Sequence, residues 1–259
     1  MSRFIFSLLL TGVSLVAQEN YEIQVYGSET VAPKSTMVEL HTNFTVSGSK
    51  TVMDGVLPTQ HAFHETLEIT HGFTPWFETG FYIFSSAGNA YGWQYVGSHI
   101  RPRVRVPEAW KWPVGVGLSA EIGYQRAKFS ANTWSLELRP IVDKQIGKTY
   151  VAFNPTLDRS FHGPGVRSGV VFSPNFKVGY DFTKKVTAGF EYYGSLGPIT
   201  SFDPFRDQQQ QFIPVIDLNL SPNWEFNFGV GVGVTGGTDH LLIKMILGRR
   251  FGVRARASL

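Results

Sequence analysis

The sequence predicts an all-β fold, a transmembrane antiparallel up-and-down β-barrel of about twelve strands. Three observations predict it: a regular alternation of apolar and polar residues, connections that alternate in length, and an export signal. Hydrophobic residues make up 42% of the 259 residues, and the mature region has no long apolar stretch. A spanning helix needs about 20 such residues. Since only helices and closed barrels satisfy every backbone polar group in lipid, a membrane protein of this composition is a barrel.

The alternation has the period of a β-strand and continues from residue 36 almost to the C-terminus. It is clearest in 224–234, where every even-numbered residue is apolar, and in 114–125. Each alternating segment reaches or approaches the roughly 9–11 residues of a tilted membrane-spanning strand. The segments are 36–46, 61–73, 77–87, 93–106, 114–127, 133–143, 149–158, 171–181, 186–196, 212–220, 224–234 and 240–251.

The connections between these segments alternate in length. The long polar ones are 47–60, 159–170 and 197–211, and the tight turns are 74–76, 182–185 and 221–223. Outer-membrane barrels have short periplasmic turns and longer outer loops, so the N- and C-termini of the barrel are both expected in the periplasm. Trp76, Trp110 and Trp112 lie in short or moderate connections and suit an aromatic girdle at the periplasmic interface.

The patterns divide the chain into four parts. Residues 1–17 have a basic residue before an apolar core, which indicates a signal peptide. Residues 18–35 are polar and are expected to form a periplasmic N-terminal extension. The barrel then occupies 36–251, and 252–259 form a C-terminal tail. We therefore expect the outer membrane of a Gram-negative bacterium, with membrane lipid and the barrel-assembly machinery as partners.

The alternation also sorts the charged residues onto one strand face. Arg or Lys in mid-membrane lipid costs roughly 2–4 kcal/mol, so this face is expected to line the lumen. The lumen-lining candidates are His99, Arg101, Arg103, Arg105, Glu121, Glu137, Arg139, Lys177, Glu191, Asp217, Glu225 and Lys244. The arginines form a basic ladder that is expected to face Glu and Asp on other strands. Such a ladder either sets selectivity or holds the lumen shut.

A polar lumen favours a small porin-like channel or transporter for small polar or amphipathic molecules. Twelve strands lie between barrels that side chains just fill and barrels that leave an open channel. The alternatives are a closed structural or adhesive barrel with binding in its loops, an outer-membrane lipid-modifying enzyme and a secreted soluble β-protein. The net charge of +3 includes no basic stripe, so nucleic acid is not expected as a partner.

Three motifs of nucleotide-binding, zinc and catalytic sites occur in the sequence, but none has the secondary structure that its chemistry needs. The stretch 231–236 fits G-x-G-x-x-G but lies in a strand pattern, without the helix that a dinucleotide site needs. The segment 61–71 carries three His and two Glu, but on a strand rather than on the helix of a zinc motif. Ser98 and His99 are adjacent and therefore point to opposite faces, which separates a nucleophile from its base. We expect no catalytic residue, no metal site, no cofactor and no enzyme activity.

Three segments resemble a known group of proteins. They are Tyr21 to Val31, His99 to Pro107 and Phe190 to Pro198. Over most of its mature length the chain resembles uncharacterised bacterial outer-membrane barrel proteins, loosely related to the transporters grouped with phenol-degradation pathways. The resemblance implies a barrel with a transport role. It supplies no catalytic residues, and a phenolic substrate does not follow from it.

Overall fold

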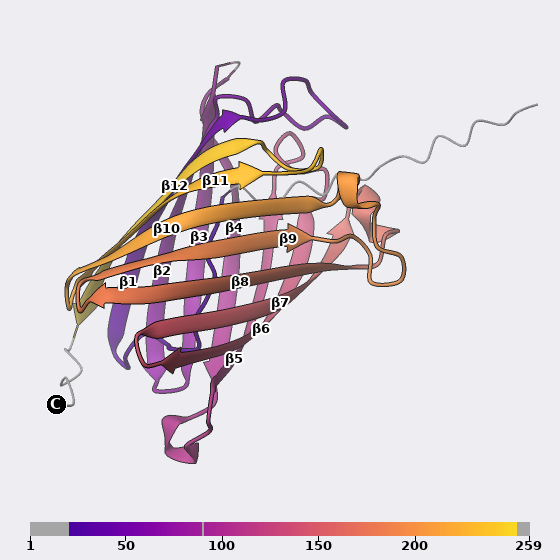
Figure 1. Ribbon diagram of the computed structural model, residues 1–259. Helices are drawn as coiled ribbons and strands as arrows, with labels where there is room; N and C mark the ends of the chain where they lie inside the picture. Colours follow the sequence, from indigo (N-terminus) through magenta and orange to yellow (C-terminus); the bar gives the residue numbers. More distant parts are fainter. Residues whose placement is uncertain (1–20, 90, 253–259) are drawn as a thin grey trace, which may run out of the picture.

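The computed structural model describes residues 21–89 and 91–252 of the chain. They form one closed antiparallel barrel in which each strand pairs with its sequence neighbours and β1 pairs with β12 (Figure 1). The prediction of a twelve-stranded up-and-down barrel is confirmed. The expected signal peptide at 1–17 and the tail beyond residue 252 lie outside the described residues.

The strands follow the alternating segments of the sequence closely. Their bounds are β1 Ser35–Ser47, β2 Phe63–Thr74, β3 Phe77–Gly88, β4 Tyr91–Arg105, β5 Gly115–Gln125, β6 Trp134–Ile146, β7 Thr149–His162, β8 Val170–Thr183, β9 Val186–Ser195, β10 Gln209–Ser221, β11 Trp224–Gly233 and β12 Leu241–Gly252. Short 3-10 helices η1 (Glu108–Trp110), η2 (Pro164–Val166) and η3 (Phe205–Asp207) lie in the connections. Among the described residues, no helix has the length and apolar character needed to cross a bilayer.

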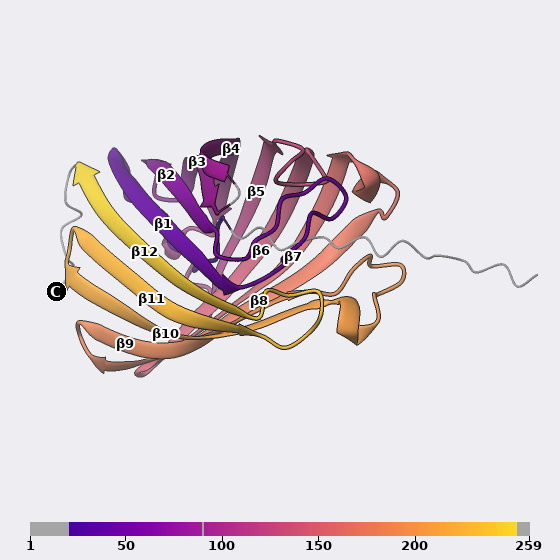
Figure 2. The same ribbon diagram turned by 90° about the horizontal axis from the view of Figure 1, so that it is seen from above.

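The two ends of the barrel differ in the length of their connections. One end has tight turns at 75–76, 147–148, 184–185 and 222–223, together with the start of β1 and the end of β12 (Figures 1 and 2). The opposite end has most of the longer connections. Because outer-membrane barrels keep short turns in the periplasm, the end with tight turns is the periplasmic end. The connection that contains η1 is a longer exception at this end.

The outside of the barrel is a belt of exposed apolar side chains. It includes Leu40, Ile69, Phe81, Ile100, Ile122, Val142, Phe153, Val178, Phe228 and Leu247. Trp76, Trp110 and Trp112 are exposed near the periplasmic end, and Trp93 and Trp134 near the outer end. A closed barrel with an apolar belt and interfacial aromatic residues satisfies its backbone and its surface only in a membrane. The protein lies in the bacterial outer membrane.

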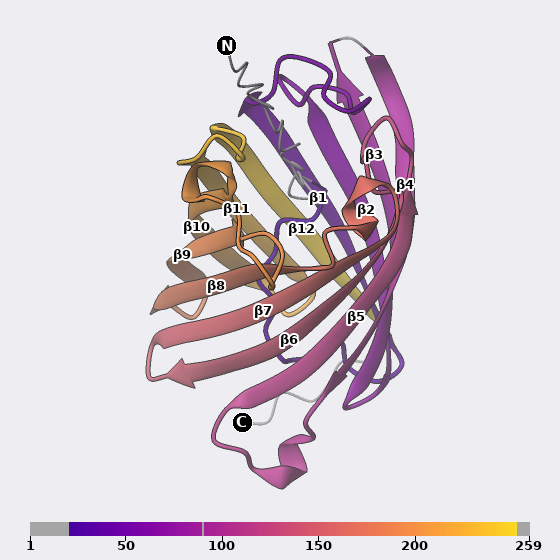
Figure 3. The same cartoon turned by 90° about the vertical axis from the view of Figure 1, so that its right-hand side faces the viewer.

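Residues 21–34, here called the lumen segment, lie inside the barrel (Figure 3). At the outer half of the lumen, the Thr66 hydroxyl donates to the Tyr21 carbonyl at 2.6 Å. At the periplasmic end, the Lys34 amide donates to the Gly72 carbonyl at 2.8 Å. For residues 21–34, this placement corrects the expectation that 18–35 form a periplasmic extension, and residues 18–20 lie outside the described residues.

The reason for the correction lies in the two faces of the lumen segment. Ile23 and Val25 are buried against an apolar part of the lumen wall. That part of the wall consists of Ala152, Tyr193, Ile213, Val215 and Leu242. The alternate residues Glu22 and Tyr26 face the charged side chains of β4 and β6. Burial of apolar surface therefore holds one face of the segment, and polar contacts hold the other.

Candidate functional site

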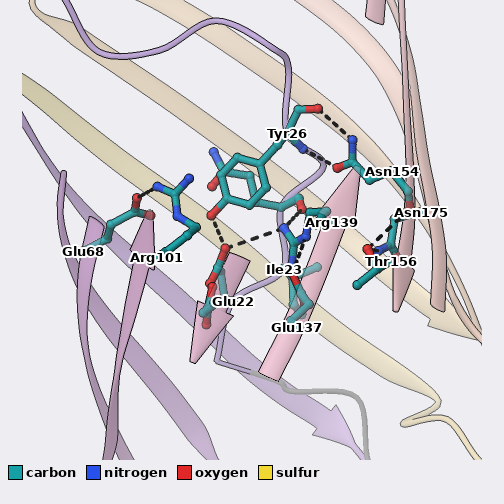
Figure 4. Close-up of polar contacts among 12 residues, drawn as sticks. Glu22, Ile23, Tyr26, Glu68, Arg101, Glu137, Arg139, Asn154, Thr156 and Asn175 are labelled. Atoms are coloured by element: carbon teal, nitrogen blue, oxygen red, sulfur yellow. Dashed lines mark hydrogen bonds and ion pairs between the residues drawn. The ribbon is translucent and has the colours of Figure 1, made fainter. Parts of the chain in front are cut away.

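The expected basic ladder surrounds one tyrosine of the lumen segment. The centre of the Tyr26 ring lies 4.7 Å from the guanidinium carbons of Arg101 and Arg139 (Figure 4). It lies 5.2 Å from that of Arg103. The Tyr26 backbone amide donates to Asn154 of β7 at 2.8 Å. Cations over an aromatic face attract its electron density, so the ladder binds the segment as well as lining the lumen.

Two arginines of β4 pair with carboxylates on the two preceding strands. Arg101 pairs with Glu68 of β2 at 2.5 Å and with Glu78 of β3 at 3.5 Å. Arg103 pairs with Glu78 at 2.7 Å and donates to two carbonyls of the lumen segment, at 2.6 and 3.3 Å. All four side chains are at most 8% exposed. Charges this deeply buried are tolerated because they are paired and hydrogen-bonded.

Arg139 of β6 joins the lumen segment to its own strand. Its guanidinium pairs with Glu137 at 2.7 Å and lies 3.8 Å from Glu22 (Figure 4). It also donates to the Gln24 carbonyl at 3.4 Å. The Tyr26 hydroxyl donates to Glu22, which closes the network within the segment.

A second ion-pair group lies across β8, β9, β10 and β12. Lys177 pairs with Glu191 at 3.1 Å and with Asp217 at 2.8 Å. Lys244 pairs with Glu191 at 2.6 Å and donates to the Ile23 carbonyl at 2.8 Å. The structure therefore brings together four predicted residues that sequence spacing alone does not connect. The other predicted residues form separate pairs: His99–Glu121 at 2.6 Å, Arg105–Glu108 at 3.1 Å and Glu225–Arg250.

Three sequence motifs considered for catalysis, metal binding or nucleotide binding can be located in the structure. The Ser98 hydroxyl contacts Tyr95, whereas His99 points inward to Glu121, so the Ser–His neighbours face apart. The His61 ring hydrogen-bonds to its neighbour Gln60 at 2.7 Å, in the connection before β2. The glycine-rich stretch 231–236 continues from β11 into the next connection and has no helix after it.

Sequence reasoning missed the contribution of the lumen segment. Glu22, Gln24 and Tyr26 contact the network, yet the segment was assigned to the periplasm. The available signal was the alternation of Glu22 and Gln24 with Ile23 and Val25. This alternation has the period of an extended chain with two different faces, which matches the divided lumen wall.

Two cavities flank the lumen segment. The outer cavity has a volume of about 380 Å³, and its lining includes His64, Tyr91, Gln125, Phe129 and Arg159. The periplasmic cavity has a volume of about 360 Å³, and its lining includes Gln145, Lys177, Asp181, Asp217 and Glu225. Gln24 lines both cavities. The lumen segment therefore forms part of the partition between an outer and a periplasmic chamber.

Solved structures that resemble the chain are outer-membrane barrels. The NanC porin matches with a TM-score of 0.55 at 11% identity, covering 83% of this chain and all of that one. The KdgM porin, solved in complex with disordered oligogalacturonate, matches with a TM-score of 0.49 at 13% identity, covering 85% and 99%. Omp33 of Acinetobacter baumannii gives 0.46 at 10% identity, covering 87% and 100%. The NanC likeness supports the barrel fold.

The sequence itself matches one family. A comparison with curated proteins gives no match. Residues 106–241, more than half of the chain, match the profile of a family described as "Putative MetA-pathway of phenol degradation". This range runs from the residue after β4 to the first residue of β12 and agrees with the resemblance found in the sequence. The chain belongs to this family.

Proposed function

We propose that the protein is a small porin-like channel for small polar or amphipathic molecules, in which the lumen segment restricts passage. The observation that carries the proposal is the pair of chambers, one toward each end of the barrel, with Gln24 on the lining of both. Each chamber falls within the roughly 300–1,000 Å³ of small-molecule sites. The lining is polar and charged, with aromatic side chains in the outer chamber.

Arg101, Arg103 and Arg139 have two roles in this proposal. They supply the charge that a solute meets, and they hold the lumen segment in place. Loosening the segment therefore joins the chambers and raises conductance. No catalytic group enters this mechanism, because passage depends on size and on electrostatic complementarity.

Single-channel recording in planar bilayers tests the proposal. We expect small or infrequent openings for the wild type and conductance at least several-fold higher after deletion of residues 21–32. Arg103→Ala should act in the same direction, because it removes two hydrogen bonds to the segment. Arg249→Ala is the matched control, since this exposed guanidinium lies over the rings of Trp224 and Phe251.

The filled centre of the lumen favours a second candidate, a closed structural barrel whose outer loops carry any binding. In that case the deletion variant shows no channel openings in the bilayer, although its heat-modifiable gel migration shows that it is folded. Silence of the wild type, of Arg103→Ala and of the folded deletion variant would reject the channel. Loss of ligand or cell-surface binding after shortening the loops 48–62 and 196–208 would then support the closed barrel.

A further inference from the structure

One buried cluster in the lumen wall is not explained by the channel. The register of β1 and β2 places Glu39 directly opposite Glu68, and His41 lies two residues along β1 on the same inward face. All three side chains are at most 6% exposed. One ligand-type atom of each, a carboxylate oxygen or a ring nitrogen, lies within 4.8 Å of the others. The cluster therefore has the compactness of a coordination site.

The atoms that face one another in this cluster are not satisfied by hydrogen bonds. Both ring nitrogens of His41 lack a hydrogen-bond partner within the described chain, as do Glu39 Oε1 and Glu68 Oε2. The distance between His41 Nε2 and Glu68 Oε2 is 3.3 Å. Tetrahedral ligands held about 2.0–2.1 Å from a zinc ion are separated by a similar distance. Buried polar atoms without partners are costly, so a group that binds all of them is favoured.

Around the cluster, carboxyl groups outnumber the guanidinium groups that pair with them. Glu39 and Glu68 are directly opposed, an arrangement that destabilises a strand pair when both are charged. Glu225 also approaches Glu39, because both flank Gly248, which has no side chain to separate them. Arg101 neutralises Glu68, and Arg250 neutralises Glu225. Among the described residues, Glu39 forms no ion pair with an Arg, Lys or His, and its side chain is hydrogen-bonded to Glu225.

The surroundings also orient one ligand. Glu68 Oε1 accepts hydrogen bonds from Arg101 at 2.5 Å and from the Thr70 hydroxyl at 2.6 Å. These bonds fix the carboxylate and leave Oε2 directed at His41. Metal ligands are usually held in this way by neighbouring groups that do not touch the metal.

We propose that Glu39, His41 and Glu68 bind a divalent transition-metal ion of the Zn²⁺ type, with one coordination position left for water. One imidazole and two carboxylates favour zinc over Ca²⁺ or Mg²⁺, which prefer oxygen ligands alone. Glu225 contacts the Glu39 side and also lines the periplasmic chamber, which gives the ion a route from the periplasm. The site joins β1 to β2, and Glu68 links it to Arg101 of the lumen network.

The site can be tested by isothermal titration calorimetry. The refolded full-length protein is first treated with a chelator and is then titrated with Zn²⁺. We expect one high-affinity zinc ion per chain, not displaced by excess Ca²⁺. Glu39→Gln and His41→Gln should each weaken zinc binding by more than about tenfold. Mutation of residues that only hydrogen-bond to metal ligands already lowers metal affinity by that much. His71→Gln is the control, because His71 contacts Thr36 and lies outside the cluster.

Co²⁺ provides a second readout, since its visible absorption reports coordination by nitrogen and oxygen. The spectrum should appear with wild type and His71→Gln, and disappear with Glu39→Gln. Absence of one-to-one zinc binding by the wild type overturns the proposal. Equal weakening by the control and by the ligand variants overturns it too, as does unchanged binding by a folded Glu39→Gln protein.

Discussion

At the residue scale, the lumen depends on buried charges that satisfy one another across strands. Lys244 and Glu191 are at most 2% exposed and are 2.6 Å apart. Lys244→Met leaves Glu191 with a weakened set of partners in a desolvated place, and removal of one partner of a buried pair costs about 3–5 kcal/mol. We expect a loss of this size in the free energy of unfolding, measured by urea titration in detergent micelles.

The control for this prediction is Lys184→Met, in an exposed tight turn, which should change stability by less than about 0.5 kcal/mol. The double variant Lys244→Met with Glu191→Gln should recover part of the loss, because no buried charge remains uncompensated at that pair. Strictly additive losses would show that the two side chains do not stabilise each other.

The sequence could predict which residues face the lumen but not which of them meet. Period-two alternation placed Arg101, Arg139 and Lys244 on the polar face, and all three are inside the barrel. Their partners depend on strand register and on what fills the centre. Glu191 meets Lys244 across two intervening strands, a contact that no spacing within one strand encodes.

At the element scale, the lumen segment and β2 approach so closely that one glycine is required. A methyl group at Gly72 would collide with the backbone carbonyl oxygens of Val31 and Ala32. Gly72→Ala should therefore lower stability by about 1–3 kcal/mol, the usual cost of overpacking. The measurement is the temperature at which the folded band disappears in heat-modifiable gel electrophoresis. Gly92→Ala is the matched control, since nothing lies within 4 Å of its added methyl.

The same substitution in a variant that lacks residues 21–32 separates a collision with the segment from an effect on the strand. Without Val31 and Ala32 the added methyl has room, so Gly72→Ala should then cost little. A penalty of equal size in both backgrounds would mean that the glycine is needed by β2 itself and not by the lumen segment.

The strands could be predicted because each has a long alternation of apolar and polar residues. The lumen segment has only a short one. Membrane-spanning strands repeat an apolar face that must meet lipid, so alternation alone identifies them. The lumen segment has only two buried aliphatic residues in its alternation, Ile23 and Val25, and its polar residues resemble those of a solvated extension. The apolar wall that receives it comes from β7, β9, β10 and β12, which are distant in sequence.

At the scale of the whole molecule, the barrel has a direction. The tight turns, the start of β1 and the end of β12 all lie at the periplasmic end of the barrel. The chambers on either side of the lumen segment have different lining residues. Both chambers have polar and charged linings, with Tyr91 and Phe129 in the outer chamber and Tyr150 and Phe226 in the periplasmic one. A solute that enters from outside therefore passes the outer chamber, with its rings and the Glu137–Arg139 pair, before it reaches Lys177 and Lys244 in the periplasmic chamber.

This direction can be tested in cells because the chain contains no cysteine, so any introduced thiol is unique. Asp54→Cys lies in an exposed outer connection and Lys184→Cys in an exposed tight turn. A membrane-impermeant maleimide should label Asp54→Cys in intact cells, and Lys184→Cys only after the outer membrane is permeabilised. Both variants should label equally in detergent, which controls for thiol reactivity. Labelling of Lys184→Cys in intact cells, with Asp54→Cys protected, would reverse the orientation and place the lumen segment's Tyr21 end toward the periplasm.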